Sequence, residues 1–223
     1  MYELYITNKN YTSWGLRLWL LMTELGIPFE ERLVPYDSRP FKTFSPNGCV
    51  PALHDGDVVV WDSLAITEYL AERHAGVWPA DPIARAWARS AAAEMHSGFT
   101  TLRTRCTNNC GVRVRLFDFP AALAAEIARL SELWADGLRR FGGPFLTGRA
   151  FCAVDAFFAP VAFRAQTYAL PFDGVAADYL GRLLELAGMR SWYAAGLAET
   201  GRDPAHETEL AASGSITLDL RAR

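Results

Sequence analysis

The sequence lacks both a surplus of basic charge and any apolar run of the ~20 residues that cross a bilayer. Its 223 residues carry 22 Lys and Arg against 25 Asp and Glu, a formal net charge of −3. Because basic side chains are what bind phosphate backbones, this balance argues against nucleic acid or a membrane surface as the partner. Residues 1–3 lead directly into a short strand, without the basic region and long apolar run of a secretory signal. We therefore expect a globular cytoplasmic protein.

Cysteine and histidine are both scarce, with four residues of each. A cytoplasmic setting makes reduced thiols the default state of these cysteines. Cys106 and Cys110 are close in sequence, but no histidine pair accompanies them at the spacing of zinc ligands. We expect no metal site, and we expect most of the cysteines to act as small, partly buried apolar side chains.

What the sequence does have is hydrophobic patterning, with half of its residues apolar, enough for a substantial core. Residues 3–6 read as a strand, 12–25 as a helix that Gly26 closes, and 29–34 as a second strand. This βαβ unit predicts two parallel strands. A strand–turn–strand–helix unit over residues 46–70 then completes a four-stranded sheet of thioredoxin type.

The pattern changes after residue 76. Glycine and two prolines near residues 74–82 mark a linker, and almost only helical periodicity follows. We predict helices over 83–105, 120–141 and 154–168, the last one buried, and two shorter helices around 175–187 and 189–198. From residue 199 the sequence is polar and poorly patterned, which predicts a surface tail. The expected plan is an α/β thioredoxin-like domain over 1–76, a linker over 77–82 and an all-α helical domain over 83–223.

Features that could bind a ligand occur at both ends of the segment 46–70. Pro51 has no N–H to give to a sheet, so it begins a strand and leaves the backbone of Val50 free to bind an extended ligand. Asp62 and Ser63 begin a helix, whose free N–H groups and partial positive charge suit a carboxylate. One edge for a peptide backbone and one helix end for a carboxylate together predict a small-peptide site.

These residues resemble the glutathione-binding half of glutathione transferases, in which a Val-Pro-Ala-Leu stretch with a cis proline precedes an acidic residue and a helix-opening serine. Residues 2–26 are similar to the family's first strand and helix, and residues 155–164 to its second-domain core helix. The resemblance implies the glutathione transferase fold, with glutathione as co-substrate and no metal. It assigns glutathione binding to Cys49, Val50, Pro51, Asp62 and Ser63.

The same resemblance puts the active Ser, Cys or Tyr where the first strand meets the first helix, often about five residues before an arginine. The residue five positions before Arg17 is Thr12, which is therefore the candidate for the active residue, with Ser13 adjacent and Tyr11 as a lesser candidate. A hydroxyl donor and a helix N-terminus would lower the pKa of a thiol by roughly one to three units. Alternatively, Thr12 or Asn10 simply caps the helix.

Two departures from the family pattern stand out. Cys49 occupies a position where a polar residue commonly helps to hold the glycine carboxylate of glutathione. Lys42 or His54 could replace that group, and Cys49 could instead form a mixed disulfide with the ligand. Cys152 and Asp155 keep the acid of the family's Ser/Thr-x-x-Asp cap but lose its hydroxyl, which predicts a loss of ~1 kcal/mol.

A second substrate is expected between the domains. His96, Arg103 and Arg164 are the candidates, because arginines can bind an anionic or carboxylated substrate. The alternatives are arginines on a solvated helix face and a structural histidine. Residues 10–14 also resemble the serine-rich opening of the zeta class, the maleylacetoacetate isomerases.

Three functions therefore remain open. The first is a transferase that adds the glutathione sulfur to a small electrophile, as in detoxification. The second is a glutathione-dependent cis-trans isomerase of the maleylacetoacetate type, as in aromatic amino-acid catabolism. The third is a non-catalytic interaction protein. The family resemblance further implies a homodimer.

Overall fold

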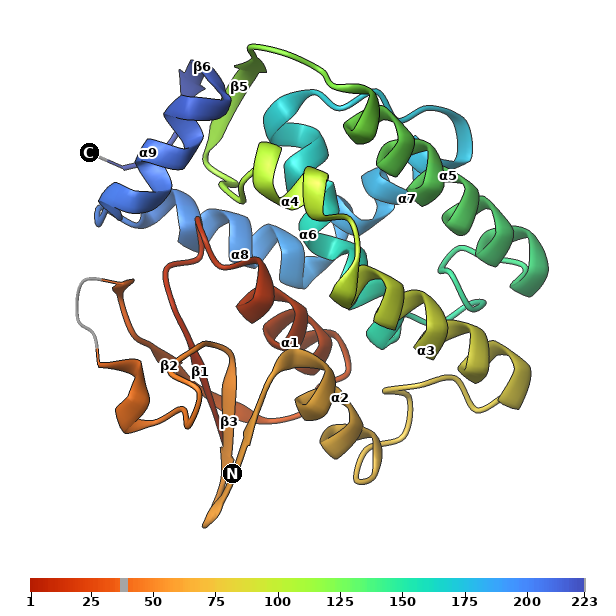
Figure 1. Ribbon diagram of the computed structural model, residues 1–223. Helices are drawn as coiled ribbons and strands as arrows, with labels where there is room; N and C mark the ends of the chain where they lie inside the picture. Colours follow the sequence, from red (N-terminus) through yellow and green to blue (C-terminus); the bar gives the residue numbers. More distant parts are fainter. Residues whose placement is uncertain (37–39, 223) are drawn as a thin grey trace.

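The structure is a computed structural model, and it describes residues 1–36 and 40–222. The first part of the chain forms one mixed sheet in the strand order β2-β1-β3-β4 (Figure 1). Strand β1 pairs with β2 in parallel and with β3 in the antiparallel direction, which is the predicted thioredoxin-like arrangement. The elements of this half are β1 (Tyr2–Ile6), α1 (Ser13–Glu24), β2 (Phe29–Leu33), the short 3-10 helix η2 (Phe41–Thr43), β3 (Ala52–Asp55), β4 (Val58–Trp61) and α2 (Ser63–Ala71).

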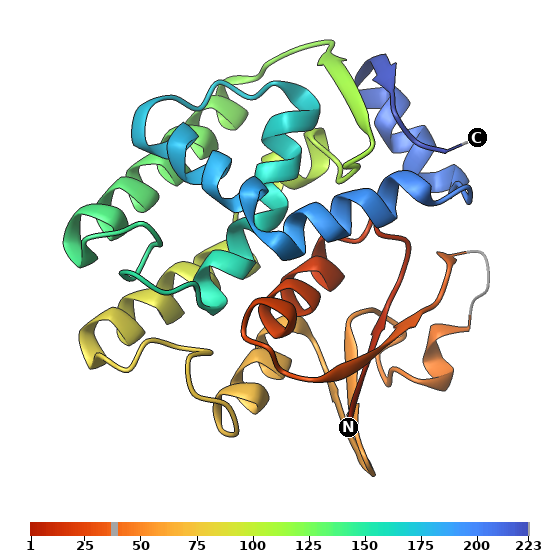
Figure 2. The same cartoon turned by 180° about the vertical axis from the view of Figure 1, so that it is seen from behind.

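The second part is predominantly helical and lies over the α1 side of the sheet (Figures 1 and 2). Helix α6 runs through its middle with nearly every residue buried, as its apolar sequence predicts, and it packs against α1, α3 and α7. Helix α8 contacts α1 and so joins the two halves. The elements are α3 (Pro82–Ser97), α4 (Thr100–Arg105), β5 (Val112–Leu116), α5 (Ala121–Phe141), α6 (Ala153–Tyr168), α7 (Gly174–Glu185), α8 (Ala187–Ala198), α9 (Pro204–Ser213) and β6 (Gly214–Asp219).

The structure differs from the sequence-based expectation at two places in this half. The helix predicted over 83–105 is divided into α3 and α4, because Gly98 ends α3 and Phe99 takes a left-handed conformation with φ 53°. Residues beyond 199 are not an unpatterned tail. Asp203 caps α9 by accepting from the His206 N–H at 3.1 Å, and β6 then pairs with β5 as a two-stranded antiparallel sheet.

The remaining sequence-level expectations concern single residues. The Val50-Pro51 peptide is cis, as the family resemblance implies. Cys49 is exposed and the other three cysteines are buried. Across the ranges 1–36 and 40–222, no helix has the length and apolar character needed to cross a membrane.

Candidate functional site

A cavity of about 700 Å³ opens where the cis-proline segment, η2 and the starts of α1 and α2 meet. All five residues predicted to bind glutathione line it: Cys49, Val50, Pro51, Asp62 and Ser63. Sequence reasoning did not single out several other residues of its wall, which are Trp14, Tyr36, Pro40, Phe41, Asn47 and Gly48. The cavity wall therefore combines the cis-proline segment and the start of α2 with the aromatic residues Trp14, Tyr36 and Phe41.

Asp62 forms the polar end of the cavity. Its backbone is left-handed, with φ 76°, and its Oδ1 caps α2 by accepting from the Leu64 N–H at 2.8 Å. The other carboxylate oxygen, Oδ2, lies 3.5 Å from Nε2 of His96 on α3. A carboxylate at a helix start thus lies beside the free N–H groups of the first turn, so this end of the cavity can meet both an ammonium and a carboxylate.

The three residues predicted to contact a thiolate have separate environments. Thr12 is the N-cap of α1, and its Oγ1 accepts from the Gly15 N–H at 3.1 Å. Ser13 is the first residue of the helix, next to the cavity residue Trp14. Tyr11 is buried and turned away, because its hydroxyl donates to Glu207 of α9 at 2.7 Å. None of these three residues lines the cavity in the described structure; Ser13 directly precedes the cavity residue Trp14, and the Tyr11 hydroxyl is engaged elsewhere.

Two arginine side chains are almost fully buried, and they contact Ser63 at the start of α2 and Ser13 at the start of α1. Arg17 donates from Nη1 to Ser63 Oγ at 3.3 Å, and its guanidinium lies over the ring of Trp14 at 4.2 Å. Arg164 on α6 donates from Nη2 to Ser13 Oγ at 3.4 Å. Burial lowers the pKa of Arg17 to about 9, with repulsion from Arg164 as a further cause, so both groups stay charged near pH 7.

This placement differs from the second-substrate role predicted for Arg164. The side chain is only 4 % exposed and does not line the cavity, and its Nε donates to the Cys106 carbonyl at 2.8 Å. The sequence of α6 gave no indication of this, because a lone arginine in an apolar helix is normally expected at its exposed edge.

The two other residues predicted for a second substrate border the site from the helical half. His96 packs edge-on against Trp14, with ring centroids 5.3 Å apart, and burial lowers its pKa. The guanidinium of Arg103 also lies over the Trp14 ring, 5.3 Å from its centroid, and it donates to the His96 carbonyl at 3.0 Å. Neither residue lines the cavity: Arg103 contacts its wall through Trp14, and His96 does so through Trp14 and Asp62.

Lys42 and His54, the two residues that could replace the polar group missing at Cys49, differ in their position. Lys42 lines the cavity, whereas His54 does not, because its Nε2 is hydrogen-bonded to the Phe44 carbonyl at 2.7 Å. Gly48 has φ 71°, and a β-carbon there would lie 3.1 Å from Cγ of Lys42. The glycine thus lets the lysine stem lie along the cavity wall. In the part of the chain that the structure describes, no three His, Cys, Asp or Glu residues gather as metal ligands.

Part of the chain matches a known family model, and most of it is similar to known proteins. Residues 11–73 match the family model "Glutathione S-transferase, N-terminal domain". The chain is 29% identical over 174 residues to a glutathione S-transferase-like protein, OpS6, from Beauveria bassiana, covering 71% of this chain and 76% of the relative. It is 24% identical over 174 residues to a stringent starvation protein A homolog from Pasteurella multocida, covering 74% and 78%.

The fold is also similar to solved structures. One is a maleylacetoacetate isomerase from Methylobacterium extorquens AM1 with bound malonate and glutathione, with a TM-score of 0.68 at 22% identity, covering 90% of this chain and 99% of the other. At this identity the likeness concerns the fold alone.

Proposed function

Because this chain belongs to the glutathione S-transferase superfamily, we propose that its cavity binds glutathione, ionises the thiol and presents the sulfur to a small electrophile. The observation that carries the proposal is the convergence of two features on one cavity. The cis Val50-Pro51 segment offers a free backbone edge, and the Asp62-Ser63 helix start offers a site for the amino-acid head.

Each part of the tripeptide finds a complementary group. The backbone of Val50 pairs with the cysteinyl unit, as a strand edge pairs with an extended peptide. The γ-glutamyl head meets the start of α2, with its carboxylate on the Ser63 side and its ammonium on the Asp62 carboxylate. The glycine carboxylate meets Lys42, which supplies the charge that Cys49 cannot.

Titration calorimetry with glutathione tests the proposal directly. We expect saturable binding at millimolar ligand or below, and absorbance of bound thiolate near neutral pH. Absence of binding at millimolar glutathione contradicts the proposal. Binding without a thiolate signal favours the non-catalytic interaction protein instead.

Asp62→Asn is expected to raise KM for glutathione about tenfold or more, since a hydrogen bond to a charged group contributes about 1.5–3 kcal/mol. Asparagine tolerates the left-handed backbone and caps helices as well as aspartate does, so the change removes only the charge. Steady-state kinetics measure the effect.

The matched control is Asp81→Asn. Asp81 caps α3 through the Ala84 N–H at 2.8 Å and does not line the cavity. The KM of the Asp81→Asn variant for glutathione should stay at the wild-type value. Equal changes in the two variants would show that a helix cap, and not an ammonium site, was lost.

A glutathione-dependent isomerase is the second candidate. It is favoured by the structural likeness to the maleylacetoacetate isomerase and by Arg103, a cation beside Trp14 at the side of the cavity. An assay with maleylacetone separates the two functions. Conjugation of aryl halides without any turnover of maleylacetone would exclude the isomerase.

The assembly proposed is a homodimer formed through β4 and α2. Trp61 and Val58 are exposed large apolar side chains there, and a second hollow lined by Trp61, Leu64 and Ala65 adjoins Asp62. A second copy covering this surface would lie next to the glutathione site. Light scattering should give about twice the 24.7 kDa chain mass, and a monomer that still turns over glutathione would contradict the dimer.

A further inference from the structure

Two buried guanidinium groups hold two serine hydroxyls at helix starts: Ser63, which lines the cavity, and Ser13, which precedes the cavity residue Trp14. Arg17 donates to Ser63 Oγ at the start of α2, and Arg164 donates to Ser13 Oγ at the start of α1. Arg17 is 2 % exposed and Arg164 is 4 % exposed. An oxygen that accepts from a guanidinium keeps its own hydrogen free to be donated elsewhere.

The charge of this pair is not balanced by the protein. Among residues 1–36 and 40–222 neither arginine forms an ion pair within 4.0 Å, and Nε of Arg17 is buried without a hydrogen-bond partner. Arg103 adds a third positive charge, while Asp62 is the carboxylate whose field reaches Arg17. Two desolvated cations next to each other are costly unless an anion comes close. Beside the field of Asp62, an anionic ligand would therefore be favoured at this position.

The geometry explains why the pair remains in place without it. Arg164 is anchored by its 2.8 Å bond to the Cys106 carbonyl, with the buried Tyr168 nearby on the same helix. Arg17 lies between the rings of Trp14 and Phe157, 4.2 and 4.7 Å from their centroids, which compensates part of the desolvation through cation–π contact. Both guanidiniums are therefore fixed before any ligand arrives.

We propose that Arg164 is a positioning residue for thiolate formation: it holds the Ser13 hydroxyl so that its hydrogen is donated to the glutathione sulfur, and together with Arg17 it supplies the positive field that stabilises the thiolate. The S–H proton leaves to solvent, the electron pair stays on sulfur, and Ser13 remains protonated throughout. This inference rests on the proposed function.

Ser13, and not Thr12, carries the hydrogen bond in this arrangement. Thr12 Oγ1 is already engaged as the cap of α1, and a β-carbon on Gly15 would lie 2.9 Å from it, so the threonine is tightly enclosed. Because Arg164 belongs to α6, activation of the thiol also depends on the helical half being docked onto the first half. A hydroxyl that accepts from a cation is a stronger donor, which is how a weak acid such as serine can serve here.

A double-mutant cycle tests the proposal through the thiol pKa of bound glutathione, read from thiolate absorbance against pH. Arg164→Gln is expected to raise that pKa by about one unit, the size of one charge-assisted hydrogen bond. In a Ser13→Ala background the same change should shift it by much less. Arg164→Lys, which keeps the charge, should recover part of the shift.

The control is Arg105→Gln, which removes a nearby exposed charge that pairs with Asp118 and does not touch Ser13. It should leave the thiol pKa unchanged. An Arg164→Gln variant with the wild-type thiol pKa, or with an equal shift in both backgrounds, would overturn the proposal. If Arg164→Gln fails to fold, Arg164→Lys is measured in both backgrounds instead: a smaller rise in the thiol pKa with Ser13 that disappears with Ser13→Ala supports the proposal, and no rise or an equal rise in both overturns it. Failure of the wild-type protein to bind glutathione would instead reject the proposed function, so the two failures are distinguishable.

Discussion

Replacing Asp155 with alanine is expected to lower the free energy of unfolding by about 3–5 kcal/mol, because three buried donors lose their acceptor at once. The carboxylate accepts from the backbone N–H groups of Leu146 and Cys152, at 3.1 and 3.0 Å, and from the Tyr179 hydroxyl at 2.9 Å. It therefore fixes the start of α6, the loop before it and helix α7 together. Denaturant unfolding followed by circular dichroism measures the loss.

Tyr179→Phe is the matched control. It removes one hydroxyl from the same cluster and leaves Asp155 with both backbone donors, so we expect a loss of only about 1 kcal/mol. An equal loss in the two variants would show that packing around the tyrosine ring, and not the carboxylate, stabilises this junction.

Asp155 also makes stability depend on pH. Burial raises the pKa of Asp155 to about 6, against 3.8 for a free side chain. Between these values the folded protein keeps a proton that the unfolded chain has released, so this contribution is complete below about pH 4 and is lost as the pH rises through 6. Asp155→Asn should abolish this part of the pH dependence.

The first half of the fold could be predicted because its signals are local. The helix expected over 12–25 is observed as α1 over residues 13–24, and the cavity forms at the predicted segment 46–70. Proline, a turn glycine and a helix cap each determine the backbone within a few residues, so a short window of sequence is enough to place them.

The contacts that sequence could not place all join distant residues. Ser13 and Arg164 are 151 positions apart, and their contact depends on how α6 packs against α1. Strand β6 alternates over only six residues, two of its apolar side chains face solvent, and its partner β5 lies about a hundred residues earlier. A short exposed strand has no strong pattern of its own, so nothing distinguished it from a tail.

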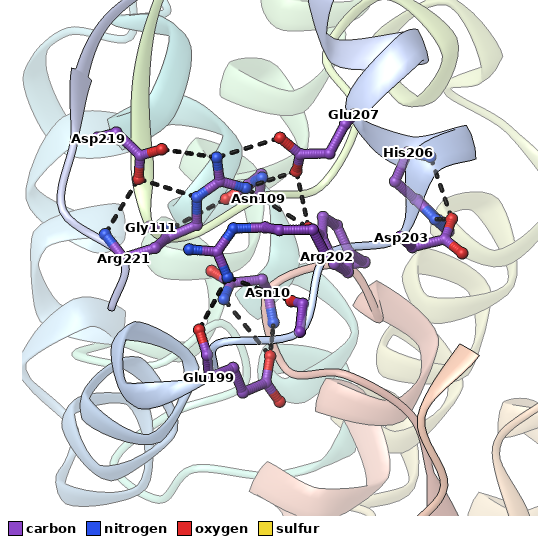
Figure 3. A network of polar contacts seen from close by, with 12 residues as sticks. Asn10, Asn109, Gly111, Glu199, Arg202, Asp203, His206, Glu207, Asp219 and Arg221 are labelled. Carbon is purple, nitrogen blue, oxygen red and sulfur yellow. Dashed lines mark hydrogen bonds and ion pairs between the residues drawn. The ribbon is translucent and has the colours of Figure 1, made fainter. Parts of the chain in front are cut away.

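Tyr11 illustrates a further limit. It is two positions from Ser13, yet its hydroxyl donates to Glu207, a member of the cluster in Figure 3, where Arg221 lies between Glu207 and Asp219. The Ser13 hydroxyl contacts Arg164 instead, so the two side chains meet different parts of the structure. Closeness in sequence therefore did not imply a shared role.

Arg221→Met is expected to destabilise the protein by roughly 2–4 kcal/mol, somewhat less than a fully buried pair, since its partners are partly exposed. Arg221 has a side-chain exposure of 3 % and forms ion pairs with Glu207 and Asp219. Its hydrogen bonds, which reach 2.7 Å to Asp219 Oδ2, lower the pKa of that carboxyl. The variant leaves the carboxylates of Glu207 and Asp219 without the cation that they share.

The loss of stability in Arg221→Met should appear first in the segments around Arg221 and only then in the whole protein. Helix α9 and the C-terminal end of α8 hold the loop that begins with Asn8, since Tyr11 donates to Glu207 and Glu199 accepts from the Lys9 N–H at 2.7 Å. Hydrogen exchange should therefore rise over residues 8–13 and 204–219 in Arg221→Met while the core of α6 stays protected. The loop leads directly into Ser13, so the same variant should also weaken thiolate formation.

Two comparisons decide whether charge is the cause. Adding Glu207→Gln and Asp219→Asn to Arg221→Met neutralises the carboxylates left without a partner, and most of the lost stability should return. Arg190→Met removes an exposed arginine that pairs with Glu185 on the surface, and it should change stability by less than about 1 kcal/mol. If the triple variant is no more stable than Arg221→Met, the packing of the arginine stem against Gly111, and not its charge, anchors the C-terminal strand.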